Sequence, residues 1–448
     1  MPKSPQDLTQ SLLSAAKAAG ADSADAIALA GTAVSIDVRA GLLEQAERAE
    51  GSDIGLRVFV GKRSAIVSAS DTSDHTIETM AARAVAMARE APEDPCAGLA
   101  DPDQLAADWD LAALELSDET AEPAPATLED DARRAEAAAL GHEGITQVQS
   151  ASAAYSARDV WLAASNGFEG GYRRTSRSTS CVAIAGTGLG MERDYDGDSR
   201  TFQADLRSPE EIGHSAAERT LARLNPGKPK TGAYPVLFDE RIAASLIGHL
   251  MAAANGAAVA RGASWLMNAM GEQILPEGLS LIEDPHRPRA SGSRPFDAEG
   301  LPTRKRAIIE HGVLKNWTLD LANARKLGLD PTGNAARSAG SGPSPTPWNL
   351  ALTQGSHSRD DLIRAMGTGL IVTSMIGATI NGNTGDYSRG AAGLWVENGE
   401  ITGPVSGVTV AGNLRDMLPS IVPANDARLH LSRVVPSLLV EGLTLAGE

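Results

Sequence analysis

The sequence predicts an α+β fold: an N-terminal domain of two repeated β-rich units, each closed by a helix, followed by a mostly β C-terminal domain. The same order of strands and then a helix occurs twice in the first half of the chain. A segment rich in proline and glycine, 226–232, then precedes a half in which short strand-like runs dominate. Because 448 residues exceed what one hydrophobic core usually organises, we expect units over 1–105 and 106–227 and a domain over 233–448.

The first unit combines strand-like runs with one amphipathic helix. Alternating apolar residues predict strands over 26–29, 34–38, 55–60 and 65–68, with a turn at Gly61-Lys62. From Ile77 to Ala88, apolar residues recur at spacings of three and four, as on one face of a helix. Pro92 ends that helix.

The second unit repeats this order. Strands are predicted over 147–154, 159–164, 175–185 and 201–206, with a turn at Asn166-Gly167. Ser208, Pro209 and Glu211 then supply an N-cap, a first-turn proline and a capping-box glutamate. A helix is therefore expected from this cap to Asn225.

The C-terminal domain begins with a strand over 234–238 and a helix that Asp239 caps, from Glu240 to about Asn255. Short helices are predicted over 320–326 and 360–366, a strand, loop and hairpin over 295–316, and strands over 370–374, 393–397 and 405–410. Residues 335–347, rich in Gly, Ser and Pro, are typical of a loop.

Composition excludes several classes of protein. A net charge of −17 argues against direct binding to nucleic acid, which needs clustered cations. No run is apolar enough to cross a membrane, and no signal peptide is visible at the start, so a cytoplasmic protein is expected. Between 90 and 131 there are fourteen acidic residues and no Lys or Arg. We interpret this stretch as a solvated face or connector, held to a core by Trp109, Leu111 and Leu114.

Familiar catalytic and metal motifs are missing. Cys96 and Cys181 lie in dissimilar segments and cannot form a tetrahedral metal site between them. There is no Gly-x-Ser-x-Gly elbow and no His-Glu-x-x-His pair. Of eight scattered histidines, His249 is the informative one because it lies within a predicted helix. Its neighbours at i−4 and i+4 are Ser245 and Ala253, so this helix supplies no second ligand.

A glycine-rich segment, 381–393, is the densest group of unusual residues. It is either a tight loop between two strands or a surface at which backbone approaches a peptide or another chain closely. The candidate contact residues are Thr384, Gly385, Asp386, Tyr387, Ser388, Arg389 and Gly390.

Several long runs resemble the PmbA branch, also called TldE, of the TldD/PmbA metallopeptidase family. They are Asp386–Glu400, continuing through Pro404-Val405 to Ala411–Leu414, together with Phe296–Gly300 and Ala324–Leu329. The resemblance covers nearly the whole chain and is strongest from residue 235 onward.

The resemblance implies that a TldD-type subunit binds the metal through a His-Glu-x-x-x-His helix, with a cysteine ligand near the C-terminus. Laid on that motif, Gly248 and Ala253 stand at the histidine positions, and His249 stands at the glutamate. No cysteine follows Cys181. We therefore expect no metal or other cofactor in this chain, and zinc in a TldD-type partner.

The expected function is that of a metal-free subunit that pairs with a TldD-type metallopeptidase and helps to degrade or process unfolded or extended peptides. The chain is not expected to be catalytic alone. One alternative is a non-enzymatic peptide-binding or adaptor protein, including a homodimer. Another is an enzyme whose metal site is built from dispersed residues. The family's older name implies a link to DNA gyrase, which the residues do not address.

Overall fold

The computed structural model describes residues 3–447, and its first half repeats one pattern of a helix, three strands and a second helix. The first repeat consists of α1 (Pro5–Ala19), β1 (Ser23–Arg39), β2 (Leu42–Val60), β3 (Arg63–Ala69) and α2 (Asp74–Glu90). The second consists of α4 (Pro125–Leu140), β4 (Ile145–Ala164), β5 (Glu169–Ala185), β6 (Glu192–Arg200) and α5 (Pro209–Leu221). The predicted repeat is confirmed. Each unit also begins with a helix, α1 or α4, that the strand-and-helix pattern did not predict.

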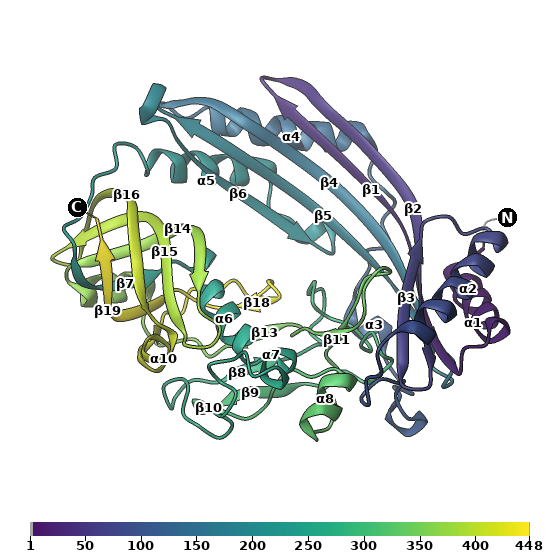
Figure 1. The fold of residues 1–448 in the computed structure, drawn as a ribbon. Coiled ribbons are helices and arrows are strands. Elements are labelled where there is room, and N and C mark those ends of the chain that lie inside the picture. Colours follow the sequence, from purple (N-terminus) through teal and green to yellow (C-terminus); the bar gives the residue numbers. More distant parts are fainter. Residues whose placement is uncertain (1–2, 448) are drawn as a thin grey trace.

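All six strands form one antiparallel sheet in the order β3-β2-β1-β4-β5-β6. At its centre β1 pairs with β4 from Asp25↔Ala164 to Val38↔Ala151. The two units therefore share a continuous sheet, and the strands predicted as short runs are parts of much longer ones. Figure 1 shows this sheet arching over the rest of the molecule.

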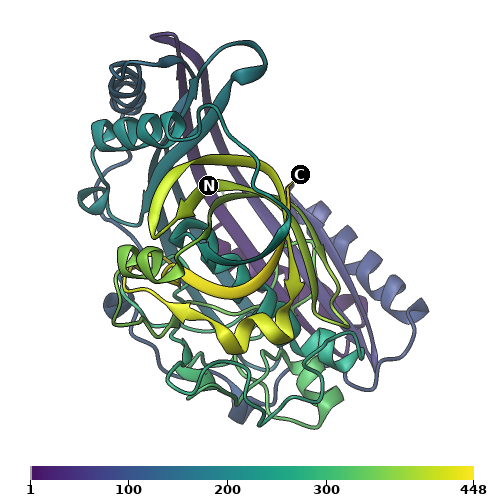
Figure 2. The same ribbon diagram turned by 90° about the vertical axis from the view of Figure 1, so that its left-hand side faces the viewer.

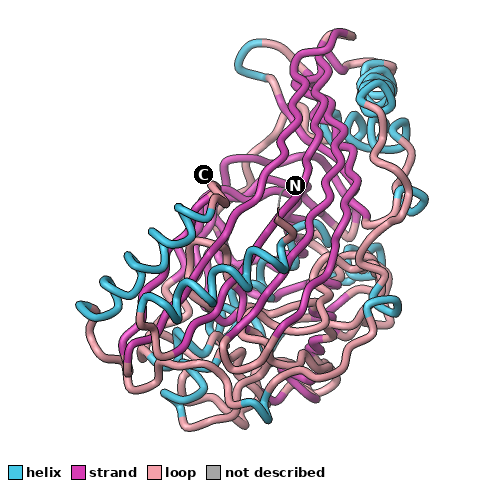
Figure 3. The backbone as a smooth tube through the Cα atoms, turned by 90° about the vertical axis from the view of Figure 1, so that its right-hand side faces the viewer, coloured by secondary structure: helices cyan, strands magenta, loops and turns pink. Residues whose placement is uncertain are grey.

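Two helix pairs cover separate parts of the sheet, as Figure 3 shows from the side on which the chain begins. α1 and α2 bury residues such as Leu12 and Ala84 against Ile54 of β2. α4 and α5 bury Ala135 and Ile212 in a second cluster. No helix within residues 3–447 is long and apolar enough to cross a membrane.

The strand predicted over 201–206 is wrong. Residues Gln203–Asp205 form a single 3₁₀ turn, and the edge strand β6 lies earlier in the chain. The buried side chains of β6 are carboxylates, and one of them, Asp196, accepts hydrogen bonds from Arg207 at 2.9 Å and Arg219 at 2.7 Å. A search for alternating apolar residues misses a strand whose buried face is charged.

The acidic stretch over 90–131 contains only a 3₁₀ turn (Pro102–Gln104), the short helix α3 (Leu111–Leu114) and the start of α4. Two of its predicted anchors do pack. The ring of Trp109 lies 4.9 Å from that of Phe296, and Leu114 is buried. Leu111 is 39% exposed, so its predicted role as an anchor is wrong: it lies on the solvent side of a helix of only one turn.

The C-terminal half contains a small β-barrel. Its strands are β7 (Gly232–Phe238), β14 (Gly369–Ile380), β15 (Asp386–Glu397), β16 (Glu400–Asn413) and β19 (Leu438–Ala446), with the short β17 (Val422–Pro423) beside β19. Pairing of β16 with β19, through residues such as Val410 and Leu445, closes the ring that Figure 2 shows from its end.

Shorter elements make up the rest of the C-terminal half. A second sheet contains β8 (Leu281–Glu283), β9 (Arg306–Glu310), β10 (Val313–Leu314), β13 (Leu350–Leu352) and β18 (Arg433–Val434), and a two-stranded one contains β11 (Ala335–Ala336) and β12 (Ser344–Pro345). The helices are α6 (Glu240–Ala253), α7 (Gly256–Ala260), α8 (Leu321–Leu327), α9 (Arg359–Met366) and α10 (Leu414–Met417), with a 3₁₀ turn at Leu418–Ser420. Another 3₁₀ turn, Gly188–Gly190, lies between β5 and β6 of the large sheet.

Candidate functional site

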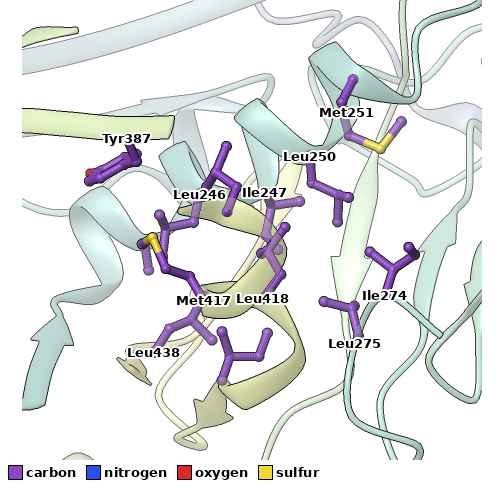
Figure 4. Packing of buried hydrophobic residues seen from close by; sticks show 14 of the residues in the cluster. Leu246, Ile247, Leu250, Met251, Ile274, Leu275, Tyr387, Met417, Leu418 and Leu438 are labelled. Atoms are coloured by element: carbon purple, nitrogen blue, oxygen red, sulfur yellow. The ribbon is translucent and has the colours of Figure 1, made fainter. Parts of the chain in front are cut away.

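The site is built on α6, the helix that follows the first barrel strand. Asp239 caps its first turn by accepting the N–H of Arg241 at 3.3 Å. Its apolar face, which includes Leu246, Ile247 and Leu250, packs into the main core beside α10, as Figure 4 shows. This packing fixes the rotation of the helix about its axis, and so places His249 away from the core's centre.

The three positions singled out on α6 have different surroundings. Ala253 is buried, and its carbonyl accepts the Ser264 hydroxyl at 2.6 Å. Gly248 is half-buried, and a Cβ there would lie 3.4 Å from the guanidinium of Arg433. Only His249 carries a group that could bind a metal or move a proton.

His249 contacts Tyr387, which belongs to the other predicted segment. The two rings meet edge to face with centroids 5.9 Å apart. Met375 of β14 accepts the Tyr387 hydroxyl at 3.3 Å through its sulfur. The structure therefore brings the two candidate sites together, although they lie far apart in the sequence.

Two polar atoms on the same side of α6 are buried without a hydrogen-bond partner among the described residues. They are Nε2 of His249 and the hydroxyl oxygen of Ser245, one helical turn earlier. Buried polar groups are usually hydrogen-bonded, so an exception marks a place where a ligand or another chain could supply the partner. Ser245 was noted in the sequence only as a neighbour of His249.

Arg389 supplies the positive charge of the site. Its Nε donates to the carbonyl of Gly377 at 2.7 Å, which holds the side chain against β14. Burial lowers the pKa of His249, and the nearby Arg389 guanidinium lowers it further. Burial also raises the pKa of Tyr387 to about 12. At neutral pH the site therefore holds a neutral imidazole, a neutral phenol and one cation.

The first half of the predicted contact segment is a loop that its own side chains and Asn413 of β16 hold in place. Thr384 donates its hydroxyl to Asp386 at 2.6 Å, and the Asn413 amide donates to the same carboxylate at 2.9 Å. These bonds lower the pKa of Asp386. Gly385 has a φ of 85°, a conformation that glycine adopts without strain. Thr384, Gly385 and Asp386 thus shape the turn into β15.

The second half of the segment lies within the barrel wall. Ser388 pairs with Thr379 of β14 and Ala411 of β16, and Gly390 is paired on both sides in the same way. Because the backbone of β15 is already bonded in both directions, this strand cannot receive an additional peptide strand. It can present only side chains, and of its two large ones Tyr387 is buried in the core while Arg389 is partly exposed.

The donor set does not fit a zinc site. Zinc needs three or four nitrogen, sulfur or oxygen ligands. Among residues 3–447 no group of three or more His, Cys, Asp or Glu side chains could hold a metal ion. His249 alone provides one ligand.

Family models match the chain in three parts. The PmbA/TldA metallopeptidase domain 1 matches residues 24–88, the central domain matches 118–224, and the C-terminal domain matches 231–447. A metalloprotease PmbA of Escherichia coli O157:H7 is 39% identical over 93% of this chain and 90% of that protein. A metalloprotease PmbA homolog of Haemophilus influenzae is 35% identical over 92% and 90%, respectively.

Solved structures agree in fold. A Bacteroides thetaiotaomicron protein described as a candidate modulator of DNA gyrase superposes with a TM-score of 0.91 at 30% identity, covering 98% of both chains. A Thermotoga maritima protein with the same description gives 0.85 at 25% identity, covering 98% of this chain and 99% of the other. TldE of Thermococcus kodakarensis gives 0.86 at 20% identity, over 98% and 100%, and shows the fold alone.

Proposed function

This chain belongs to the TldD/PmbA metallopeptidase family, and from that premise we propose that it is a metal-free subunit of a peptidase complex. A TldD-type partner supplies the metal that activates water, and this subunit contributes part of the surface that holds the peptide. The observation behind the proposal is the state of α6: Gly248 and Ala253 carry no ligand, and His249 is a single imidazole. One imidazole cannot assemble the metal-bound water that such hydrolysis requires.

His249 and Arg389, both partly exposed, are the side chains through which this subunit contacts the peptide, and the buried Tyr387 supports His249 from behind. A neutral imidazole with an unpaired buried nitrogen can bond to a backbone N–H or C=O. Arg389 adds a cation that can bind a peptide carbonyl or carboxylate. Contacts to the backbone select peptides that are unfolded and extended rather than peptides of one sequence.

Reconstitution with a TldD-type subunit tests this function. We expect the mixture to form a heterodimer in native mass spectrometry, to contain metal only in the TldD-type chain, and to cleave an unstructured peptide that this chain alone leaves intact. In that complex Arg389→Ala should slow cleavage, while Arg364→Ala, an exposed arginine of α9, should not.

Two results would contradict the proposal. Cleavage by this chain alone with stoichiometric metal would favour a site built from dispersed residues. A homodimer that ignores the TldD-type subunit and binds peptides without cutting them would favour an adaptor.

A further inference from the structure

Both edge strands of the large sheet are shorter than their neighbours, and β6 leaves part of β5 uncovered. β5 pairs with β4 along its whole length, from Glu169 to Ala185. On the other side of β5, β6 pairs only with residues Arg177 to Ala185. Figure 1 shows β6 stopping while β4 and β5 run on toward α3. The first residues of β5 thus form an edge of their own.

The segment after α3 lies beside this edge but covers only its end. The carbonyl of Leu116 accepts the N–H of Thr175 at 3.2 Å, and the hydroxyl of Thr175 accepts the N–H of Asp118 at 2.7 Å. Peptide groups in an antiparallel strand alternate between its two sides. Gly171 and Arg173 therefore turn their N–H and C=O groups to the same side as Thr175. No partner strand covers them within the described chain.

A groove of about 730 Å³ lies against this edge. Tyr172 and Phe202 give it aromatic surfaces, and Leu116 adds an apolar one. The guanidinium of Arg289 lies 4.1 Å from the centre of the Phe202 ring and bonds to Glu115, which holds that wall in place. The groove is thus wide enough for a side chain that projects from an added strand.

The rim of the groove is negative. Glu115, Asp118 and Glu119 line it, and Arg173 is the cation in its lining. When the ion-pair partners Asp159, Asp205 and Arg289 are included, five carboxylates lie near two guanidinium groups. Glu119 is exposed. The acidic stretch of the sequence, interpreted first as a solvated connector, therefore forms one wall of a groove.

We infer that this groove is a docking site for an extended cationic peptide, which adds as a strand to β5 at Gly171 and Arg173. The open edge binds backbone, the aromatic wall takes an apolar side chain, and the carboxylates bind Lys or Arg side chains of the peptide. A second copy of this chain is disfavoured as the occupant, because two chains of charge −17 repel each other. The inference rests on the proposed function only in taking a peptide as the ligand.

Peptide binding by this chain alone tests the inference without using cleavage. The probes are a fluorescent unstructured peptide of Lys, Val and Thr, and its counterpart with Glu at each Lys. By fluorescence anisotropy the cationic peptide should bind at least about tenfold more tightly, and its affinity should fall as salt is added. Glu119→Lys should weaken it, whereas Glu143→Lys, an exposed charge in the loop after α4, should not.

The role of the open strand edge is tested by comparing the peptide affinity of the Arg173→Pro variant with that of the Arg173→Ala variant. Both variants lose the pair with Asp159, but only proline removes the outward N–H, and it leaves the bonds to β4 intact. Weaker binding in R173P than in R173A supports the inference. Equal binding of both peptides, equal binding by the two variants, or a dimer that R173P abolishes would each overturn it. If R173P does not fold, the two peptides and the Glu119 variant still decide.

A failure here is distinguishable from a failure of the proposed function. The complex could cleave peptides normally while this chain shows no preference for cationic ones, and only the docking site would then be rejected.

Discussion

The half-buried His249 shows how one side chain can report on the site. The histidine pKa in an unfolded chain is about 6.5, and burial together with Arg389 lowers it in the folded chain. As the pH falls, the unfolded chain takes up the proton first. This contribution to stability is therefore present above the unfolded pKa and is lost as the pH falls through the folded-state pKa.

His249→Leu should remove that dependence. Near neutral pH we expect the free energies of unfolding of variant and wild type to agree within about 1 kcal/mol, because the variant loses a buried nitrogen that has no partner. Between about pH 8 and about pH 5 the wild type should lose more stability than the variant. Denaturant unfolding at both pH values measures this. Parallel losses in the two proteins would show that His249 is not buried as described.

The residues of the site could be predicted, but their contact could not. His249 stands out because it lies within a predicted helix, and Tyr387 and Arg389 because they lie in a glycine-rich run. Their meeting depends on how α6 packs against the barrel, which long-range contacts decide. The buried hydroxyl of Ser245 has no local signal at all.

At the scale of single elements, the barrel depends on glycines where strands come close. A Cβ on Gly393 of β15 would lie 1.8 Å from the carbonyl oxygen of Ile371 in β14. Gly403 of β16 is a matched control, since a Cβ there meets nothing within 4 Å.

Gly393→Ala should therefore lower the free energy of unfolding by about 1–3 kcal/mol, as expected when an added methyl forces backbone to move. Gly403→Ala should change it by less than about 0.5 kcal/mol, like most surface substitutions. Chemical denaturation of both variants provides the comparison. Equal stabilities would mean that β14 and β15 are not as close as described.

The elements that were predicted are those with a clear periodicity. The helix after β3 buries Ile77, Ala84 and Ala88, the residues whose spacing predicted it. β6 was missed because its buried residues are aspartates neutralised by arginines from other elements, a partnership that one segment cannot reveal. α1 was not predicted, although Ser4 and Asp7 form a capping box at its start.

At the scale of the molecule, the repeat was visible in the sequence, but the strand pairing that connects the two units was not. β1 and β4 lie side by side only because both units place their first strand at the centre of the sheet. A group of buried polar contacts connects the large sheet to the C-terminal half. Arg57 of β2 donates to Asp25 at 2.8 Å and lies 3.5 Å from Glu299, which also accepts the N–H of Leu321.

The substitution Glu299→Gln tests the contact of Glu299 with Arg57. Burial raises the pKa of Glu299 above its usual range, with Arg57 opposing and Asp297 adding to the shift. Because the folded chain keeps this proton to higher pH, the stabilisation is present at low pH and is lost as the pH rises through the folded-state pKa. Glutamine keeps the acceptor for Leu321 but cannot ionise. Between about pH 5 and about pH 9, the unfolding temperature of the variant should therefore fall less steeply with pH than that of the wild type.

A decline of equal steepness in the Glu299→Gln variant and the wild type would show that Glu299 is already ionised in the folded chain.

A titration shows whether this chain works through a metal-binding partner. The rate of cleavage of an unstructured peptide is measured at a fixed concentration of the TldD-type subunit while this chain is added. We expect the rate to rise and to reach a plateau at one equivalent of this chain, and we expect no cleavage when the partner is absent. A rate already maximal without this chain would contradict this expectation.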